Sequence, residues 1–212
     1  MGSMDPSTLW GIALALVIVA IIGVAAFLMM RGRSRKLSGL AAARGLRYTK
    51  RDDALVGRYG GELYALNVVE GERDGHAFVV YDSTRTKEDE AGGTPKSVSV
   101  VAVRVGRRVP ELRCERRKGL LGGGHGIQTG DAEFDKHYTT TGDARFATAV
   151  LVPPVRHLLL AGKARWFACR GDAVVLCADG RYRPDQLDDA AEAAVRLVDT
   201  VPAAVWDRLP PA

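Results

Sequence analysis

The sequence predicts an α+β protein, with one N-terminal transmembrane helix followed by one domain that has an antiparallel sheet and C-terminal helices. Three observations predict this class. An uncharged apolar run covers residues 9–30, short β-branched segments with hairpin-sized connections follow it, and helical periodicity dominates after residue 143. Strands joined by short connections pair antiparallel, because a parallel pair needs a crossover of about a dozen residues or more.

The run at residues 9–30 has the length and composition of a membrane-spanning helix. Its 22 residues contain no charge and no proline, and as a helix they would extend about 33 Å, enough for a hydrocarbon core of about 30 Å. A cleaved signal peptide would need a positive leading region and a shorter apolar core. Residues 1–8 contain no Lys or Arg, so we expect a retained anchor.

Lysine and arginine on one side of the run predict its orientation. Four cations occur at residues 31–36 and none at residues 1–8. Positive charge marks the cytoplasmic side of a spanning helix. We therefore expect residues 1–8 outside the cell membrane and the domain in the cytoplasm, with an outward-facing domain as the alternative.

The basic charge of the chain is concentrated just behind the predicted anchor. Residues 31–51 hold eight Lys or Arg and no acid, whereas residues 52–212 hold 22 Lys or Arg and 24 Asp or Glu. Such a basic collar attracts anionic lipid headgroups, by about 1 kcal/mol per cation near the surface. The predicted membrane-surface residues are Arg31, Arg33, Arg35, Lys36, Arg44 and Arg47. The simpler alternative is that they only set the topology. Nucleic acid is not an expected partner, because the domain lacks a basic face with interleaved aromatic residues.

The first half of the chain predicts one helix and a series of strands. A basic juxtamembrane helix is expected over residues 31–45, with Leu37, Leu40 and Ala41 on one side and Gly45 as its end. The domain proper is expected over residues 46–207, and residues 208–212 form a tail. Asp52 and Asp53 begin a helical turn that Gly60 and Gly61 end. Strands are expected at residues 46–48, 62–70, 77–81, 97–105 and 112–115, with a hairpin connection at 71–75, a loop at 86–94 and a flexible glycine-rich loop at 118–130.

The second half predicts mainly helices. Asp143 caps a helix over residues 144–152, the proline pair Pro153-Pro154 breaks it, and a second helix ends near Gly162. A hairpin of strands at residues 165–169 and 173–178 turns at Arg170-Gly171-Asp172. Pro184 then begins an amphipathic helix with Leu187, Ala191, Ala194, Val195 and Val198 at helical spacing, and Pro202 begins a short final helix.

No catalytic, cofactor-binding or metal-ligating residue is predicted. The glycine-rich segment 119–126 lacks the Lys-Ser/Thr pair of a phosphate-binding loop, and no G-x-S-x-G motif occurs. Cys114, Cys169 and Cys177 lack C-x-x-C spacing and are expected to be reduced, and Cys169 and Cys177, which flank a hairpin, are expected to be buried. Asp131, Glu133, Asp135, His137 and His125 match no known metal motif. Phe134, within that set, is expected to fill the core while its acidic neighbours remain solvated.

Several short segments resemble uncharacterised single-pass membrane proteins of actinobacteria. They are residues 43–48, 67–71, 78–82, 130–135, 143–147 and 202–206, and the resemblance spans roughly residues 40–207. It implies a fold and a location but no established activity.

The sequence favours a non-catalytic interaction or scaffold module at the inner face of a bacterial cell membrane. Its expected partners are the membrane, through the span and anionic headgroups, and a protein. The alternative from another class is a membrane-tethered enzyme or small-ligand-binding domain, which would need a deep pocket lined by several polar groups.

Overall fold

The structure is a computed structural model that describes residues 17–18, 32–61, 63–85, 96–117, 126–162 and 164–212. The predicted anchor at 9–30 lies outside these residues except for Val17 and Ile18, which are helical and 54% and 47% exposed. The predicted loop at 86–94 and most of the one at 118–130 lie outside them as well. Within the described ranges no single helix has the length and apolarity to cross a bilayer. The helices Ala144–Val150 and Pro153–Gly162 together have the required length and apolarity, but their axes are bent by 80° relative to each other.

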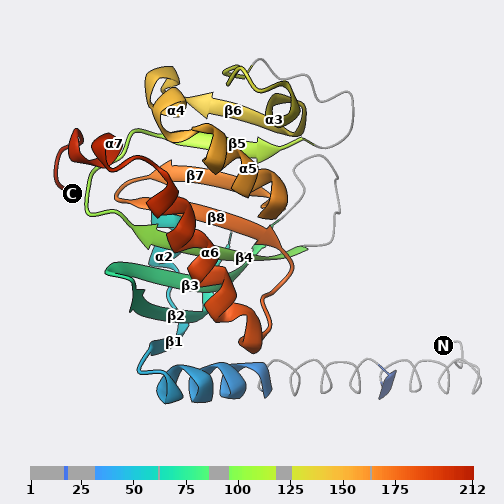
Figure 1. Cartoon of the computed structure of the whole chain (residues 1–212). Helices are drawn as coiled ribbons and strands as arrows, with labels where there is room; N and C mark the ends of the chain where they lie inside the picture. The colour runs from blue at the N-terminus through green and yellow to red at the C-terminus, as the bar shows by residue number, and fades with distance from the viewer. Residues whose placement is uncertain (1–16, 19–31, 62, 86–95, 118–125, 163) are drawn as a thin grey trace, which may run out of the picture.

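An eight-stranded antiparallel sheet forms the centre of the molecule (Figure 1), which confirms the α+β class. The strand order is β1-β2-β3-β4-β8-β7-β5-β6. The hairpin of β7 and β8 therefore lies between β4 and β5, which are neighbours in the sequence. The strands are β1 (Arg47–Arg51), β2 (Leu66–Arg73), β3 (His76–Arg85), β4 (Lys96–Arg104), β5 (Leu112–Arg116), β6 (Tyr138–Gly142), β7 (Trp166–Arg170) and β8 (Ala173–Asp179).

The helices lie mainly on one face of this sheet (Figure 1). The longest, α6, packs across β2, β3, β4 and β8 and also contacts α5. The short helix α2 packs on the opposite face. Their bounds are α2 (Ala54–Tyr59), α3 (Ala132–His137), α4 (Ala144–Val150), α5 (Pro153–Gly162), the 3-10 turn η1 (Pro184–Gln186), α6 (Leu187–Thr200) and α7 (Ala203–Asp207).

Alternating strand residues build a separate core on each face. Phe78 and Val80 of β3 point into the larger core, beneath α4, α5 and α6. Val79 and Tyr81 point into the smaller core, which α2 covers. The period of two in a strand causes this division, because successive side chains leave the sheet on opposite sides.

The predicted juxtamembrane helix is part of the folded domain. Residues 32–43 are helical, and Gly45 follows with φ of +68°, as the predicted end requires. Leu37 and Ala41 are 1% and 0% exposed and belong to the larger core, with Leu40 packed beside them. The helix lies along the edge of the sheet that β1 forms (Figure 1).

Three local predictions need correction. The connection between β2 and β3 is only Asp74-Gly75, both with positive φ, because a two-residue turn fits the twist of a hairpin. Helix α3 and strand β6 were not predicted, since a six-residue helix has too few turns to produce a period. The C-terminal tail is joined to the domain, where Arg107 pairs with Pro211 and the Ala212 N–H donates to the Gly106 carbonyl at 3.3 Å.

Candidate coupling site between the N-terminal helix and the sheet

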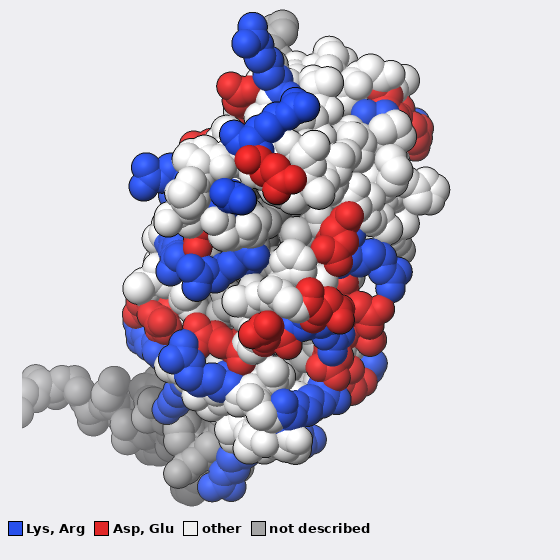
Figure 2. Space-filling view, turned by 60° about the vertical axis from the view of Figure 1, so that its left-hand side comes forward, with Lys and Arg blue, Asp and Glu red and all other residues white. Residues whose placement is uncertain are grey.

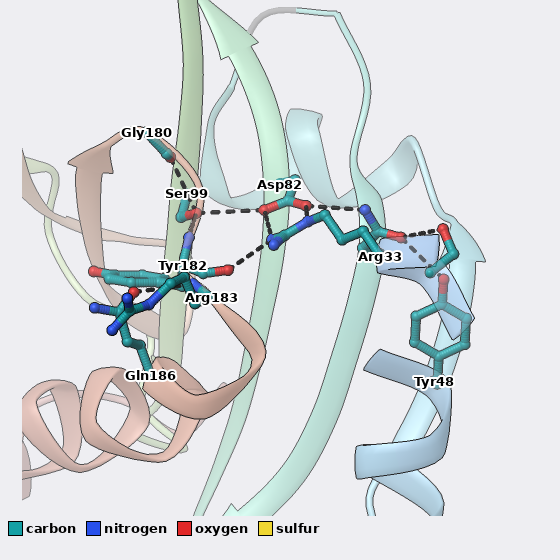
Figure 3. Close-up of polar contacts among 10 residues, drawn as sticks. Arg33, Tyr48, Asp82, Ser99, Gly180, Tyr182, Arg183 and Gln186 are labelled. Carbon is teal, nitrogen blue, oxygen red and sulfur yellow. Dashed lines mark hydrogen bonds and ion pairs between the residues drawn. The ribbon is translucent and has the colours of Figure 1, made fainter. Parts of the chain in front are cut away.

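A buried ion pair fastens the first turn of helix 32–43 to the sheet (Figure 3). Arg33 Nε donates to Asp82 Oδ2 at 3.0 Å, and Arg33 Nη2 donates to Asp82 Oδ1 at 2.9 Å. The side chains are 18% and 6% exposed. Two parallel charge-assisted hydrogen bonds hold the guanidinium in one orientation. The pair therefore fixes both the position and the rotation of the helix against β3.

A β-bulge aims a third side chain at the same carboxylate. The register of β2 against β3 shifts between Leu66 and Val69, and Asn67 in the bulge has φ of +52°. Asparagine tolerates this left-handed conformation better than most residues. Its Nδ2 donates to Asp82 Oδ2 at 2.9 Å, while its Oδ1 accepts from Ser34 Oγ at 2.9 Å and Tyr48 Oη at 3.0 Å.

The other side of the carboxylate connects to the loop that follows β8. Ser99 lies opposite Asp82 in the β3–β4 ladder, with its Oγ 3.4 Å from Asp82 Oδ1. The same Oγ accepts from the Tyr182 N–H at 3.0 Å and lies 3.2 Å from the Gly180 carbonyl. Arg33 Nη2 also donates to the Tyr182 carbonyl at 2.8 Å. The network thus joins helix 32–43, four strands and the loop after β8 (Figure 3).

A second set of ion pairs holds the other end of helix 32–43. Arg44 pairs with Asp188 at the start of α6. Arg73, at the end of β2, donates to the Asp188 carbonyl at 2.9 Å and lies 3.6 Å from the Asp188 carboxylate. Both ends of the helix are consequently connected to the elements beneath it.

The predicted membrane-surface residues separate into paired and unpaired cations. Arg33 and Arg44 have the partners just described, and Arg47 pairs with Glu70 while its side chain stays 74% exposed. Arg35 and Lys36 are exposed and form no ion pair within the described residues. Arg31 lies outside them. The sequence prediction treated all six as equivalent, because charge spacing alone does not reveal which cations face acids.

One signal in the sequence identifies Asp82 in retrospect. Phe78 and Val80 alternate in the strand expected over residues 77–81, and Asp82, one residue beyond that range, continues the same alternation, so the three share one face of β3. A carboxylate on an otherwise buried face needs a compensating partner. The partner itself lies 49 residues away in the chain, and no local pattern connects the two.

The remaining candidate residues have structural roles. All three cysteines are buried, as predicted for Cys169 and Cys177, and none forms a disulfide within the described residues. Burial raises the pKa of the Cys114 thiol to about 12. Phe134 is fully buried, as predicted. Asp131 is the N-cap of α3 and pairs with Arg156 at 3.0 Å, and Asp135 accepts hydrogen bonds from Thr129. Within the described residues no group of three or more His, Cys, Asp or Glu is arranged to hold a metal ion.

The Arg-Gly-Asp segment is a turn, as predicted, and its aspartate is nearly buried. Gly171 has φ of +63°. The Asp172 carboxylate accepts from Arg104 Nε at 2.9 Å and from Arg58 Nη2 at 3.0 Å. Burial by itself would raise the pKa of Asp172, but the hydrogen bonds and charges of Arg104 and Arg58 outweigh it and hold the pKa below its usual range.

This pKa predicts an acid-dependent loss of stability. Because the folded-state pKa of Asp172 is lowered, its contribution is present above the unfolded value of about 3.9 and is lost as the pH falls through the folded value. Asp172→Asn should reduce the free energy of unfolding by about 1.5–3 kcal/mol at neutral pH. The difference from the parent chain should shrink below about pH 4. Urea titrations over a pH series measure it, with Asp207→Asn as an exposed control. A difference that is independent of pH would contradict the prediction.

Charges of both signs are interspersed on the face of the domain shown in Figure 2. Shallow surface depressions lie among the described residues, and two of them are lined partly by charged side chains. One of about 320 Å³ lies over the ends of β5, β6 and β7 and includes Arg113 and Arg170. The other, of about 560 Å³, lies between the β2–β3 turn and α6 and includes Arg73, Glu192 and Asp199.

Comparison with known proteins identifies a related fold. No family model matches the chain, and no curated protein sequence matches it. The structure is similar to the crystal structure of the mycobacterial trehalose monomycolate transport factor A, TtfA, with a TM-score of 0.57 and 16% sequence identity. The match covers 86% of this chain and 98% of that one. At this identity the likeness establishes the fold. The neighbour is actinobacterial, which fits the resemblance noted from the sequence.

Proposed function

We propose that this protein is a single-pass membrane-anchored accessory module that holds a rigid α+β domain beside the bilayer for a protein partner. Residues 9–30 are the anchor, residues 1–8 lie outside the cell membrane and the domain lies at its inner face. The role is non-catalytic. In this proposal Arg31, Arg35 and Lys36 contact anionic headgroups where the chain leaves the bilayer.

The observation that carries this proposal is the coupling of the anchor's continuation to the domain. Arg33 is three residues beyond Met30, the last residue of the predicted span, and its guanidinium is locked onto Asp82 inside the fold. A domain that only needed proximity to the membrane would function on a flexible linker. A buried, multiply hydrogen-bonded connection instead transmits the orientation of the anchor to the sheet.

Two further observations support the proposal. Val17 and Ile18 are exposed although they are large and apolar, as expected for residues that face lipid. The similar fold belongs to a protein called a transport factor, and we take that factor to act as an accessory component. We extend that role to this chain as part of the proposal.

The anchor and the orientation are tested by reporter fusions to the full chain. A reporter that is active only outside the membrane should be inactive at the C-terminus, and the protein should stay in the membrane fraction after an alkaline carbonate wash. A variant lacking residues 9–30 should be released by the same wash. Strong C-terminal reporter activity would overturn the orientation, and release of the full chain would overturn the anchor.

The accessory role is tested by site-specific cross-linking in intact membranes. Three proteins are compared: the full chain, the chain without residues 9–30, and a chain with a Gly-Ser linker inserted between Arg31 and Gly32. The linker leaves the Arg33–Asp82 pair intact but frees the domain from the anchor. We expect the full chain to give a reproducible protein adduct that both altered chains lose. An adduct that persists with the linker, or no reproducible adduct, would contradict a rigidly oriented module.

A further inference from the structure

Chain connectivity places one end of the sheet at the bilayer surface. Three Cα–Cα steps separate Met30 from Arg33, so their Cα atoms lie at most about 11 Å apart. The headgroup layer on each side of a bilayer is about 5–7 Å thick. Arg33 in turn donates to Asp82 and to the Tyr182 carbonyl. The end of the sheet where β3 ends, β4 begins and β8 ends therefore lies next to the headgroups if the span is residues 9–30.

Two cations from distant parts of the chain lie at this end of the sheet. Lys96 is the first residue of β4, and Arg181 follows β8. The Gly180 N–H donates to the Ser97 carbonyl at 2.9 Å, and Lys96 and Arg181 are the residues next to these two in the chain. Both side chains are exposed, and neither forms an ion pair within the residues that the structure describes.

Two described acids near this end, Asp179 and Asp185, already have partners. Asp179 is paired with Arg165 at 3.2 Å, and Asp185 with Arg183 at 3.3 Å. The uncompensated charge of the described residues here is therefore positive, while Glu88, Asp89 and Glu90, in the connection from β3 to β4, lie outside the described residues. Arg35 and Lys36, in the first turn of helix 32–43, add two exposed cations close to Arg33.

We propose that Lys96 and Arg181, together with Arg35 and Lys36, form a surface that binds anionic phospholipid headgroups and holds the sheet end against the bilayer. The inference rests on the proposed function, because it needs the anchor at residues 9–30. We infer that the bound groups are lipid headgroups, because the anchor keeps these four cations beside the bilayer surface. Lys96 and Arg181 lie 45 and 130 residues beyond Arg51, where the basic collar ends, so the collar alone does not contain the site.

The test measures the distance of the loop after β8 from headgroups in the full chain. A fluorophore on Asp185→Cys reports this loop, and the same label on Asp207→Cys reports the C-terminal end. The three native cysteines are buried, so an introduced exposed cysteine is labelled selectively. Each protein is reconstituted into vesicles of phosphatidylcholine alone or of a phosphatidylcholine–phosphatidylglycerol mixture, both containing a lipid with a nitroxide headgroup that quenches nearby fluorophores.

The matched variants reverse two cations at either end of the sheet. Lys96→Glu/Arg181→Glu changes the proposed surface. Arg108→Glu/Arg208→Glu makes the same change in net charge beyond the far end of β4, which is about 27 Å long. The Arg108 N–H donates to the Pro210 carbonyl at 2.8 Å, and Arg208 is two residues before Pro210 in the chain.

We expect quenching at position 185 to be stronger in the anionic vesicles. Lys96→Glu/Arg181→Glu should reduce it about twofold or more, and raised salt should have a similar effect, because attraction to anionic headgroups is electrostatic and screened. Arg108→Glu/Arg208→Glu should leave it unchanged, and the label at position 207 should respond to neither variant. Quenching at 185 that is independent of lipid charge or of Lys96 and Arg181 would overturn the lipid surface while leaving the anchor intact. Failure of the full chain to stay with vesicles after a carbonate wash would overturn the anchor, and this inference with it.

Discussion

Asp82→Asn is expected to lower the free energy of unfolding by about 3–5 kcal/mol, because it leaves the Arg33 guanidinium largely buried without its counter-charge. The substitution keeps the size of the side chain but removes the negative charge. The new amide oxygen replaces only one of the two carboxylate oxygens, so its NH₂ group faces a donor in either orientation: Arg33 Nε and Asn67 Nδ2 in one, and Arg33 Nη2 in the other. The loss therefore combines an unpaired charge with a donor–donor contact.

Urea unfolding of the full chain in detergent micelles, followed by tryptophan fluorescence, measures this change. Asp179→Asn is the matched control, since Asp179 also pairs with an arginine but is 68% exposed. It should cost about 0–1 kcal/mol, as exposed ion pairs do. If both variants lose the same small amount, the Arg33–Asp82 pair does not couple the helix to the sheet.

Replacing both partners shows whether the stability of the domain requires the two charges themselves or only that neither charge is left unpaired. Arg33→Met/Asp82→Leu should be more stable than Asp82→Asn alone, because an apolar pair of similar volume leaves no unpaired charge. The double variant should still weaken the fixed orientation of the helix, since methionine does not reach the Tyr182 carbonyl with a donor. Equal stability of the single and double variants would contradict this explanation.

Phe134→Ala is expected to cost about 3–5 kcal/mol. Phe134 is 0% exposed, and its ring stacks on Tyr138 with the centroids 4.9 Å apart. The Tyr138 hydroxyl donates to the Ala164 carbonyl at 2.8 Å. Helix α3 has only six residues, too few to persist without tertiary contacts. Removing the ring therefore leaves a cavity and loosens the packing of α3 against β6.

The same urea titration measures this loss against two controls. Phe134→Leu should cost less, about 1–1.5 kcal/mol, because much of the apolar volume remains. Leu63→Ala changes a side chain that is 59% exposed and should stay within about 0.5 kcal/mol. A cost for Phe134→Ala no larger than that for Leu63→Ala would show that α3 contributes little to the core.

Local signals predicted most of the elements well. Asp143 caps α4 by accepting from the Phe146 N–H at 2.8 Å, as expected. The proline pair separates α4 from α5, and the periodic residues of α6 are buried. These features depend on residues within a few positions of each other, which the sequence displays directly.

Contacts between distant residues were not predictable in the same way. The insertion of the β7–β8 hairpin beside β4 depends on which strand edges complete a common core, and hairpin-sized gaps do not specify it. Helix α3 was missed because its packing, rather than its period, stabilises it. The coupling site was not predicted, because in the sequence nothing distinguishes Arg33 from the other cations of the basic collar.

The sequence by itself determined the α+β class, most helix and strand positions, the burial of Cys169, Cys177 and Phe134, and the prediction of an anchor at residues 9–30. Hydrophobic period, capping and turn chemistry are local, so they can be read along the chain. Only the tertiary structure decided which cations are paired: Arg33 with Asp82 and Arg44 with Asp188, while Arg35, Lys36, Lys96 and Arg181 have no ion-pair partner within the described residues. An ion pair depends on distance in space, and the fold alone brings residues 49 positions apart to within 3 Å.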